Sequence, residues 1–170
     1  MLELGSGVST LVAAQALRRK GSGHITSLEH DAHHAARTTQ LLHRHGLADW
    51  ADVVHAPLRE YTIRNKKWNW YGVPEGIELG TVDLLIVDGP PGRIWPKARY
   101  PALPVLIGHL SETAVILLDD AARPDEQRIL DHWAGEHPEY EAEYVACERG
   151  LAILRRRSTS RPVPEKQSSN

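Results

Sequence analysis

Acidic residues stand at the ends of several apolar, strand-like segments of this 170-residue chain. The acids in question are Glu3, Glu29, Asp88, Asp119 and Asp120. In an open α/β sheet, ligands bind at the carboxyl ends of the parallel strands. Purely structural carboxylates have no reason to concentrate at strand ends, so this pattern predicts a ligand site along that edge of a sheet.

A glycine-rich turn opens the chain, in the sequence Met-Leu-Glu-Leu-Gly-Ser-Gly-Val-Ser-Thr. Gly5 and Gly7 allow the backbone to approach a ligand closely. The helix expected to follow offers N–H groups without partners and the positive end of its dipole. Glu29, about 20 residues later at the end of the next strand, is placed to accept hydrogen bonds from a ribose diol. A ligand resembling a nucleotide is therefore expected.

The turn also bears on which nucleotide-like ligand binds. A dinucleotide fingerprint requires a third glycine, and this chain has Thr10 at that position, after Val8 and Ser9. Glu3 precedes the turn, where its charge disfavours an anionic pyrophosphate and suits a cationic ligand. A nicotinamide-dependent oxidoreductase stays an alternative, with Thr10 counting against it.

Strand and helix signals alternate along the chain, which argues for a doubly wound, mostly parallel α/β sheet in three layers. We expect a terminal antiparallel hairpin around Glu148-Arg-Gly150. The expected strands are 2–4, 24–29, 51–55, 82–88, 114–120, 140–147 and 151–156, and the expected helices are 8–19, 32–45, 103–110 and 124–133.

Two segments depart from this alternation. Residues 59–80 contain Gly72, Pro74 and Gly76 and are expected to form a loop in place of a crossover helix. Residues 157–170 are rich in Ser, Pro and charge, so we expect a disordered tail after one domain spanning 1–156.

Four segments together resemble the successive motifs of class I S-adenosylmethionine-dependent methyltransferases, across roughly residues 1–156. They are Glu3-Leu-Gly-Ser-Gly-Val-Ser-Thr10, Glu29-His-Asp31, Val82-Asp-Leu-Leu-Ile-Val-Asp88-Gly and Ile116-Leu-Leu-Asp-Asp120. The resemblance is closest to the small-molecule O-methyltransferases and implies a Rossmann-like, seven-stranded sheet. It also implies an S-adenosylmethionine site formed by Glu3, Gly5, Ser6, Gly7, Ser9, Thr10, Glu29, His30 and Asp88.

Asp88 is the expected general base, because its strand should adjoin the first strand where the strand order reverses. The other interpretation is that it caps the Gly-Pro-Pro turn that follows. The resemblance further suggests a divalent metal held by one Asp after strand four and an Asp-Asn pair after strand five. Here Asp120 stands in place of that Asn after Asp119, and Pro90-Pro91 follows Gly89. Both departures count against a metal at these carboxylates.

Aromatic residues follow the third strand and the Asp88 turn. Trp68, Trp70 and Tyr71 either line an acceptor pocket or cover a sheet face that lacks its helix, and covering is favoured for the two tryptophans. Trp95, together with Arg93 and Tyr100, is the preferred candidate for the acceptor pocket.

Composition narrows the partners. The net charge of −2 predicts no attraction to nucleic acid or membrane, and the single Cys147 favours a reducing compartment, so we expect a cytoplasmic protein with a small-molecule acceptor. A homo-oligomer is left open. Such methyltransferases usually carry helices before the first strand, so the chain is expected to be truncated at its N-terminus, to share a site with another subunit, or to bind cofactor without catalysis.

Overall fold

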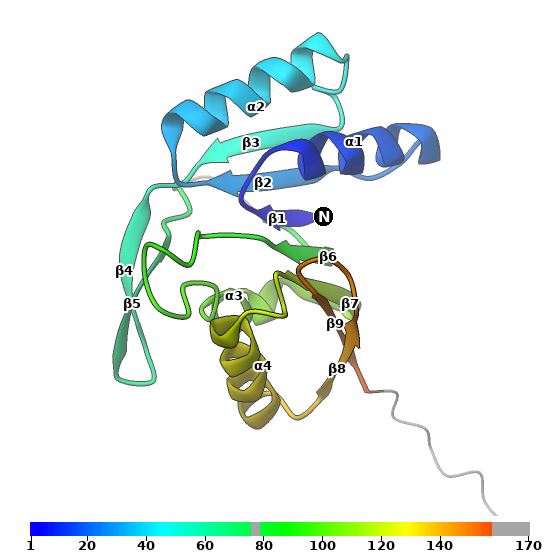
Figure 1. Cartoon of the computed structure of the whole chain (residues 1–170). Coiled ribbons are helices and arrows are strands. Elements are labelled where there is room, and N and C mark those ends of the chain that lie inside the picture. The colour runs from blue at the N-terminus through cyan, green and yellow to red at the C-terminus, as the bar shows by residue number, and fades with distance from the viewer. Residues whose placement is uncertain (76–78, 158–170) are drawn as a thin grey trace, which may run out of the picture.

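A seven-stranded sheet in the order β3-β2-β1-β6-β7-β9-β8 forms the centre of the computed structural model, which describes residues 1–75 and 79–157 (Figure 1). The first five strands of that order run parallel, and β9 pairs antiparallel with both β7 and β8. This arrangement confirms the predicted doubly wound fold with a C-terminal antiparallel hairpin. The strands of the sheet are β1 (Leu2–Leu4), β2 (Ile25–Glu29), β3 (Ala51–His55), β6 (Val82–Val87), β7 (Leu110–Asp119), β8 (Tyr140–Val145) and β9 (Leu151–Arg156).

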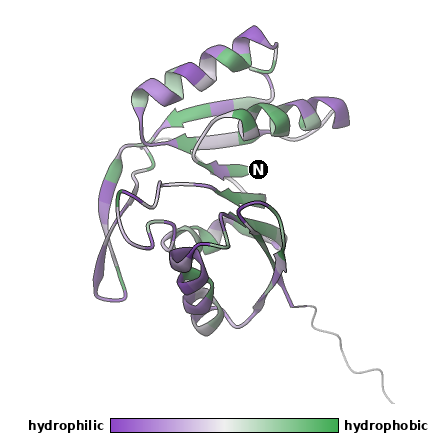
Figure 2. Cartoon of the chain, viewed as in Figure 1, coloured by the Kyte–Doolittle hydropathy of each residue, from purple (hydrophilic) through white to green (hydrophobic). Residues whose placement is uncertain are grey.

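Helices cover the sheet on both sides, and each side has its own apolar cluster. On one side, α1 (Val8–Lys20) and α2 (Ala32–Arg44) bury Leu17 and Leu42 against Ile25 of β2. On the other side, α3 (Ala102–Leu106), a 3-10 turn (Ile107–His109) and α4 (Pro124–Glu136) cover the sheet, with Trp133 in the core. The apolar colour in Figure 2 concentrates on the strands between these layers, as expected for parallel strands covered on both faces.

The segment predicted as a loop over 59–80 instead contains an antiparallel hairpin, β4 (Leu58–Ile63) and β5 (Lys66–Tyr71). Its two-residue turn has positive φ at both Arg64 (50°) and Asn65 (61°), the geometry that matches strand twist in a tight hairpin. Gly72, Pro74 and Gly76 suggested a loop, but both strands of the hairpin end before Gly72. The loop prediction was therefore wrong for 59–71.

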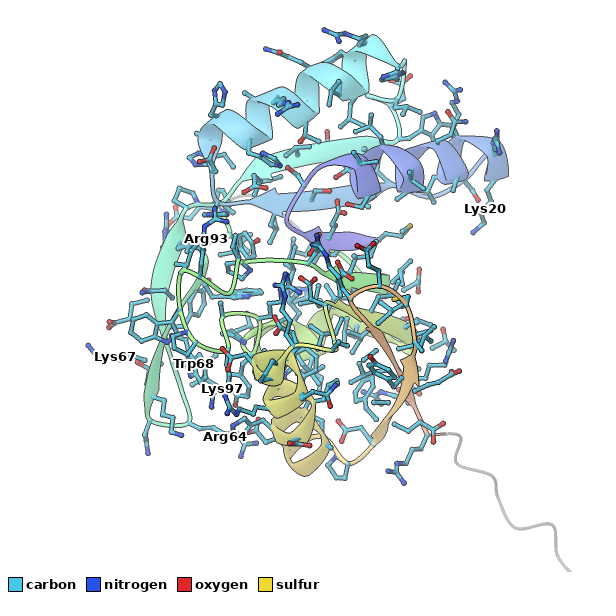
Figure 3. The ribbon with its side chains drawn as sticks, viewed as in Figure 1. Lys20, Arg64, Lys67, Trp68, Arg93 and Lys97 are labelled. Atoms are coloured by element: carbon cyan, nitrogen blue, oxygen red, sulfur yellow. The ribbon has the colours of Figure 1, made fainter. Side chains whose placement is uncertain are left out.

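The hairpin buries its aromatic side chains against the sheet, so it covers the face that a crossover helix would otherwise cover. Trp70 and Tyr71 are fully buried and Trp68 is nearly so. Trp68 stacks at 4.4 Å on the ring of Tyr100, and Figure 3 shows it on the inner side of the hairpin. The covering interpretation is confirmed for Trp68 and Trp70.

One helix is shorter than predicted. The segment 103–110 is split between α3 and the 3-10 turn, and β7 begins at Leu110 instead of Ala114, because Leu110 already pairs with Val82 of β6. The tail was predicted over 157–170, and all of it except Arg157 lies outside the described residues. Within residues 1–75 and 79–157, none of the helices has the length and apolar content needed to cross a membrane.

Candidate active site

A cavity of about 420 Å³ lies at the carboxyl ends of β1, β2 and β6, where the strand order reverses. Its size falls in the range of small-molecule sites, roughly 300–1,000 Å³. Strand ends, the glycine turn, α2 and the hairpin all contribute to its wall. The lining residues are Gly5, Ser6, Glu29, His30, Asp31, His33, His34, Arg37, Tyr71, Asp88, Gly89, Pro91 and Arg93.

The glycine turn is shaped by hydrogen bonds to the neighbouring strand. Gly5 has a φ of 98°, which L side chains rarely adopt, and its N–H donates to the Leu28 carbonyl at 2.9 Å. Both the N–H and the hydroxyl of Ser6 donate to Glu29 Oε2, at 3.1 and 3.2 Å. The turn therefore opens onto the cavity with the Glu29 carboxylate beside it.

Glu29 ends β2 with its carboxylate almost fully enclosed but facing the cavity. Its second oxygen, Oε1, accepts the N–H of Asp31 at 3.0 Å and lies 2.9 Å from Nδ1 of His30. A carboxylate has about four lone-pair positions, so these contacts leave acceptor capacity for a ligand. The structure thus brings Gly5, Ser6, Glu29 and His30 together as predicted neighbours.

The other predicted residues of the turn do not line the cavity. Glu3 is fully buried beneath the turn, where Oε2 accepts the hydroxyls of Thr10 and Ser27, both at 2.5 Å. Thr10 in turn accepts the N–H of Gly7 at 3.0 Å. Glu3 and Thr10 therefore support the turn from below. The prediction that they contact the ligand directly is corrected, because both are buried and neither lines the cavity. Ser9 is exposed on α1 away from the lining residues.

The N-terminal half of α2 supplies cavity residues that sequence reasoning missed. His33, His34 and Arg37 line the cavity, and none of them was among the predicted site residues. Asp31 caps the helix by accepting the N–H of His34 at 2.7 Å, and His34 Nε2 lies 3.0 Å from the Ser6 carbonyl. The sequence contained a signal for them, because helical spacing places positions 33, 34 and 37 on one face of a helix that begins just after Glu29.

Tyr71, at the end of the hairpin, forms part of the cavity wall next to Gly89. Its side chain is fully buried, and among residues 1–75 and 79–157 its hydroxyl has no hydrogen-bond partner. Burial is the main cause that raises the pKa of this phenol far above its ordinary value, with the Glu29 carboxylate adding to it. A buried hydroxyl without a partner is costly, and its position at the wall fits a site completed by a ligand.

A second hollow of about 280 Å³ adjoins the main cavity. Asp88, Pro91 and Arg93 line both, so Asp88 stands at the boundary between them. The residues that line the second hollow are Asp88, Pro91, Gly92, Arg93, Arg99, Asp120 and Arg123. Two adjoining spaces that share one carboxyl can hold a cofactor and an acceptor with that carboxyl between them.

Of the three residues expected to form an acceptor pocket, Arg93 lines both the main cavity and the second hollow. Trp95 is 43% exposed and belongs to neither set of lining residues. Tyr100 is buried beneath α4, where its hydroxyl donates to the Glu136 carboxylate at 2.8 Å. The aromatic acceptor pocket was therefore wrongly predicted for Trp95 and Tyr100.

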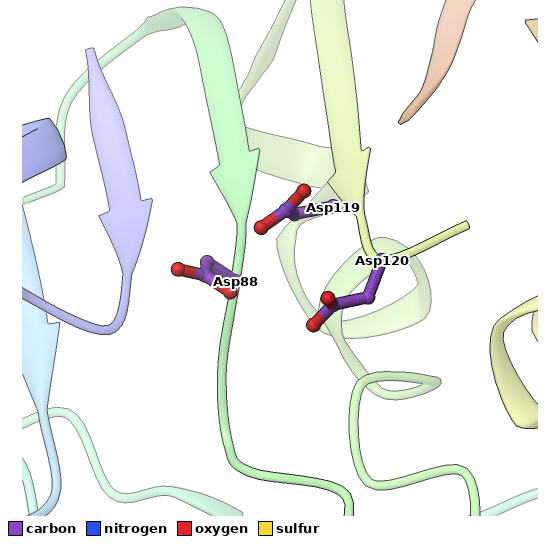
Figure 4. Close-up of side chains that lie close together, drawn as sticks. All are labelled: Asp88, Asp119 and Asp120. Atoms are coloured by element: carbon purple, nitrogen blue, oxygen red, sulfur yellow. The ribbon is translucent and has the colours of Figure 1, made fainter. Parts of the chain in front are cut away.

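Asp88, Asp119 and Asp120 converge at the ends of β6 and β7 (Figure 4). One carboxylate oxygen from each lies within 4.8 Å of those from the other two. The side chain of Asp88 is 48% exposed, yet partial burial raises the pKa of its carboxyl to about 6. Arg99 opposes this rise, and the negative charges of Asp119 and Asp120 add to it. Such a carboxyl is ionised at neutral pH and basic enough to accept a proton from a hydroxyl acceptor.

A model of a protein family, described as a methyltransferase domain, matches residues 2–121. The chain belongs to this family. The matched residues of the methyltransferase domain include the glycine turn, Glu29 and all three aspartates of the cluster. The family predicted from the four motifs is therefore confirmed, and nothing favours the nicotinamide alternative.

Solved structures share the fold of this methyltransferase domain. An O-methyltransferase from Bacillus cereus in complex with SAH has 17% identity and a TM-score of 0.69 over 92% of this chain and 73% of its own. An SAH-bound methyltransferase from Podospora anserina has 20% identity and a TM-score of 0.66, covering 92% and 70%. The O-methyltransferase TomG from Streptomyces achromogenes, in complex with SAM, has 16% identity and a TM-score of 0.64, covering 91% and 71%. No curated protein matches the chain.

Proposed function

We propose that this methyltransferase domain binds S-adenosylmethionine in the main cavity and transfers its methyl group to an oxygen of a small molecule held in the adjoining hollow. The observation that carries the proposal is the position of Asp88, which lines both spaces. The similar structures from Bacillus cereus and Streptomyces achromogenes, which hold SAH and SAM, support the choice of cofactor.

The carboxylates at the strand ends of the main cavity suit a cationic ligand, while its two lining arginines, Arg37 and Arg93, come from α2 and from the segment after Gly89. Glu29 and Asp88 line it directly, and Glu3 is buried just below the turn. The sulfonium of S-adenosylmethionine is a cation, and opposite charges attract strongly where water is excluded. We assign Glu29 to the ribose hydroxyls and the Gly5–Ser6 turn to the amino-acid end of the cofactor.

Methyl transfer makes limited demands on the protein. The bound cofactor supplies a methyl group that is already activated on sulfur. The protein must hold an acceptor oxygen in line with that methyl group, and positioning of this kind contributes roughly 7–11 kcal/mol in well-oriented systems. Asp88 takes the proton from the acceptor hydroxyl while the new O–CH₃ bond forms and the electron pair of the old bond returns to sulfur. The products are the methylated acceptor and S-adenosylhomocysteine.

Calorimetric titration of the chain with S-adenosylhomocysteine and, in parallel, with NAD tests the cofactor. We expect saturable binding of S-adenosylhomocysteine and no heat from NAD. Binding of NAD alone would overturn the proposal. Labelled S-adenosylmethionine offered with a panel of small hydroxylated molecules then tests catalysis, and cofactor binding without any transfer would favour a non-catalytic domain. An oligomer can be sought in the same samples by light scattering.

The cellular location belongs to the proposal as well. Cys147 is free and exposed, and a reduced thiol of this kind is ordinary in the cytoplasm. A cytoplasmic protein is therefore what we infer, and localisation of a tagged full chain checks it.

A further inference from the structure

Arg99 is a buried cation in the middle of the acidic cluster. Only 2% of its surface is exposed. Its Nη2 group donates to the Asp88 carbonyl at 2.8 Å and to Asp120 Oδ2 at 2.9 Å, and lies 3.2 Å from Asp88 Oδ1. Its Nη1 group donates to the Asp119 carbonyl at 2.8 Å. The guanidinium therefore links the last residues of β6 and β7 through both backbone and side chains.

Without this guanidinium, the groups around it would carry a strongly negative net charge. Asp120 is almost fully buried, and Glu126 of α4, also buried, brings Oε1 to 3.7 Å from Arg99 Nη1. Arg123 adds a second cation, 2.9 Å from Asp120 Oδ2, but its side chain is 46% exposed. Buried charges must be paired to be tolerated. Among the residues that the structure describes, Arg99 is the buried cation that pairs with these carboxylates.

A divalent metal does not fit this arrangement. Mg²⁺ or Ca²⁺ needs several oxygen ligands at roughly 2.0–2.6 Å and binds through carboxylates that are free to turn toward it. Here one carboxylate oxygen of Asp88 (Oδ1) and one of Asp120 (Oδ2) already share the Nη2 group of Arg99. A metal between them would also meet the positive guanidinium. Of the three aspartates that resemble a metal site in sequence, Asp88 and Asp120 pair with Arg99 through one carboxylate oxygen each, and Asp119 binds it through its carbonyl.

We propose that Arg99 is the resident cation of this cluster and that this methyltransferase domain holds Asp88 in position without a divalent metal. The backbone bonds fix the ends of β6 and β7 relative to each other, so the Asp88 carboxyl stays at the boundary of the two cavities. Arg99 is a positioning residue in this scheme, since it acts through Asp88. The role of Arg99 toward Asp88 rests on the proposed function, whereas the exclusion of the metal does not.

Titration of the wild-type chain with MgCl₂, MnCl₂ and CaCl₂, with and without S-adenosylhomocysteine, tests the proposal directly. We expect no saturable heat in calorimetry and no rise in Tm at millimolar salt. Saturable, one-to-one binding of any of the three ions would overturn it. This measurement needs no variant and no acceptor.

Removing the guanidinium should open the cluster to ions. In Arg99→Met we expect MnCl₂ to raise the Tm by at least about 2 °C, because the freed carboxylates become ligands and a bound ion stabilises the folded state. Arg123→Met is the matched control, since it removes an exposed partner of the same Asp120 oxygen, and its Tm should not respond. An equal response of the two variants, or none in Arg99→Met, would contradict the role of Arg99.

Arg99→Lys keeps a positive charge and covers the case in which Arg99→Met does not fold. We expect this variant to stay insensitive to ions, and acquired metal binding by it would overturn the proposal. Calorimetry with S-adenosylhomocysteine on the same samples separates the two proposals. A wild-type chain that binds neither ions nor S-adenosylhomocysteine contradicts the proposed function and leaves the assignment of Arg99 standing.

Discussion

The glycine turn and the acidic cluster at the ends of β6 and β7 both place carboxylates next to one cavity, but they satisfy them differently. At the turn, Glu3 and Glu29 accept hydrogen bonds from hydroxyls and backbone N–H groups, which carry no net charge. In the cluster, Asp88 and Asp120 are paired with the charged Arg99. Negative charge is thus retained where a cationic cofactor would bind and is offset where an acceptor hydroxyl would lose its proton.

The difference has a consequence for catalysis. An oxygen that gives up a proton develops negative charge, and fixed positive groups nearby stabilise it. Arg93, Arg99 and Arg123 all line the second hollow. The main cavity shares Arg93 and has Arg37 from α2, but the glycine turn and the end of β2 contribute the Glu29 carboxylate and no arginine. The two sides are therefore suited to charges of opposite sign, and each of the following experiments tests one side against the other.

The largest expected effect is on stability. Arg99→Met should lower the free energy of unfolding by about 3–5 kcal/mol, because it removes the buried cation from Asp120 and Glu126 and leaves Asp120 only the exposed Arg123 and Arg149. Arg123→Met removes an exposed cation from the same cluster and should cost less than about 1 kcal/mol. Urea unfolding of both variants measures the difference. Equal losses would mean that burial does not distinguish the two arginines.

The next effect concerns the cofactor side. Glu29→Gln should weaken S-adenosylhomocysteine binding about tenfold or more, since losing a hydrogen bond to a charged group costs roughly 1.5–3 kcal/mol. Glu112→Gln is the control, because the side chain of Glu112 is 95% exposed near the start of β7, at the opposite end of the strand from Asp119. Calorimetric dissociation constants decide the matter, and an unchanged constant for Glu29→Gln would refute the ribose role.

The two sides also differ in how far the sequence predicts them. The turn, Glu29 and the succession of strands and helices along the chain were predictable because they depend on local spacing, with glycines and an acid at set intervals and apolar runs of strand length. Arg99 was not, because it lies in an irregular segment between Gly89 and α3 whose path only the tertiary structure fixes. The hairpin was missed for a related reason, since Gly72 and Pro74 masked the alternation of residues 58–71.

A smaller effect separates two tyrosines of the hairpin. Tyr71→Phe removes the hydroxyl without a partner at the cavity wall, so we expect weaker S-adenosylhomocysteine binding, by about 0.5–1.5 kcal/mol, and no loss of stability. Tyr61→Phe removes a hydroxyl that donates to the Tyr71 carbonyl at 2.8 Å. It should lower stability by a similar amount and leave affinity unchanged. Calorimetry and urea unfolding of both variants check this, and the opposite pattern would make Tyr71 a packing residue only.

The last effect is in the pH dependence of the acidic cluster. Asp88 accepts a proton only when it is ionised, and partial burial raises its pKa to about 6, so kcat/KM should rise with pH through about 6 and then level off. Stability should move the other way, because a raised pKa favours folding below the unfolded value near 3.8 and that contribution is lost as pH rises through about 6.

These opposite trends identify Asp88 among its neighbours. Asp88→Asn should remove the stability trend and most of the activity, whereas Arg99→Lys should keep both. In Arg99→Met the rise in kcat/KM should move to higher pH, because the Arg99 guanidinium holds the pKa of Asp88 down. Rate profiles and urea unfolding between pH 4 and pH 8 measure all of these, over a range that brackets the raised pKa. If the rise stays in place in Arg99→Met, the charge that governs the acceptor side does not come from Arg99.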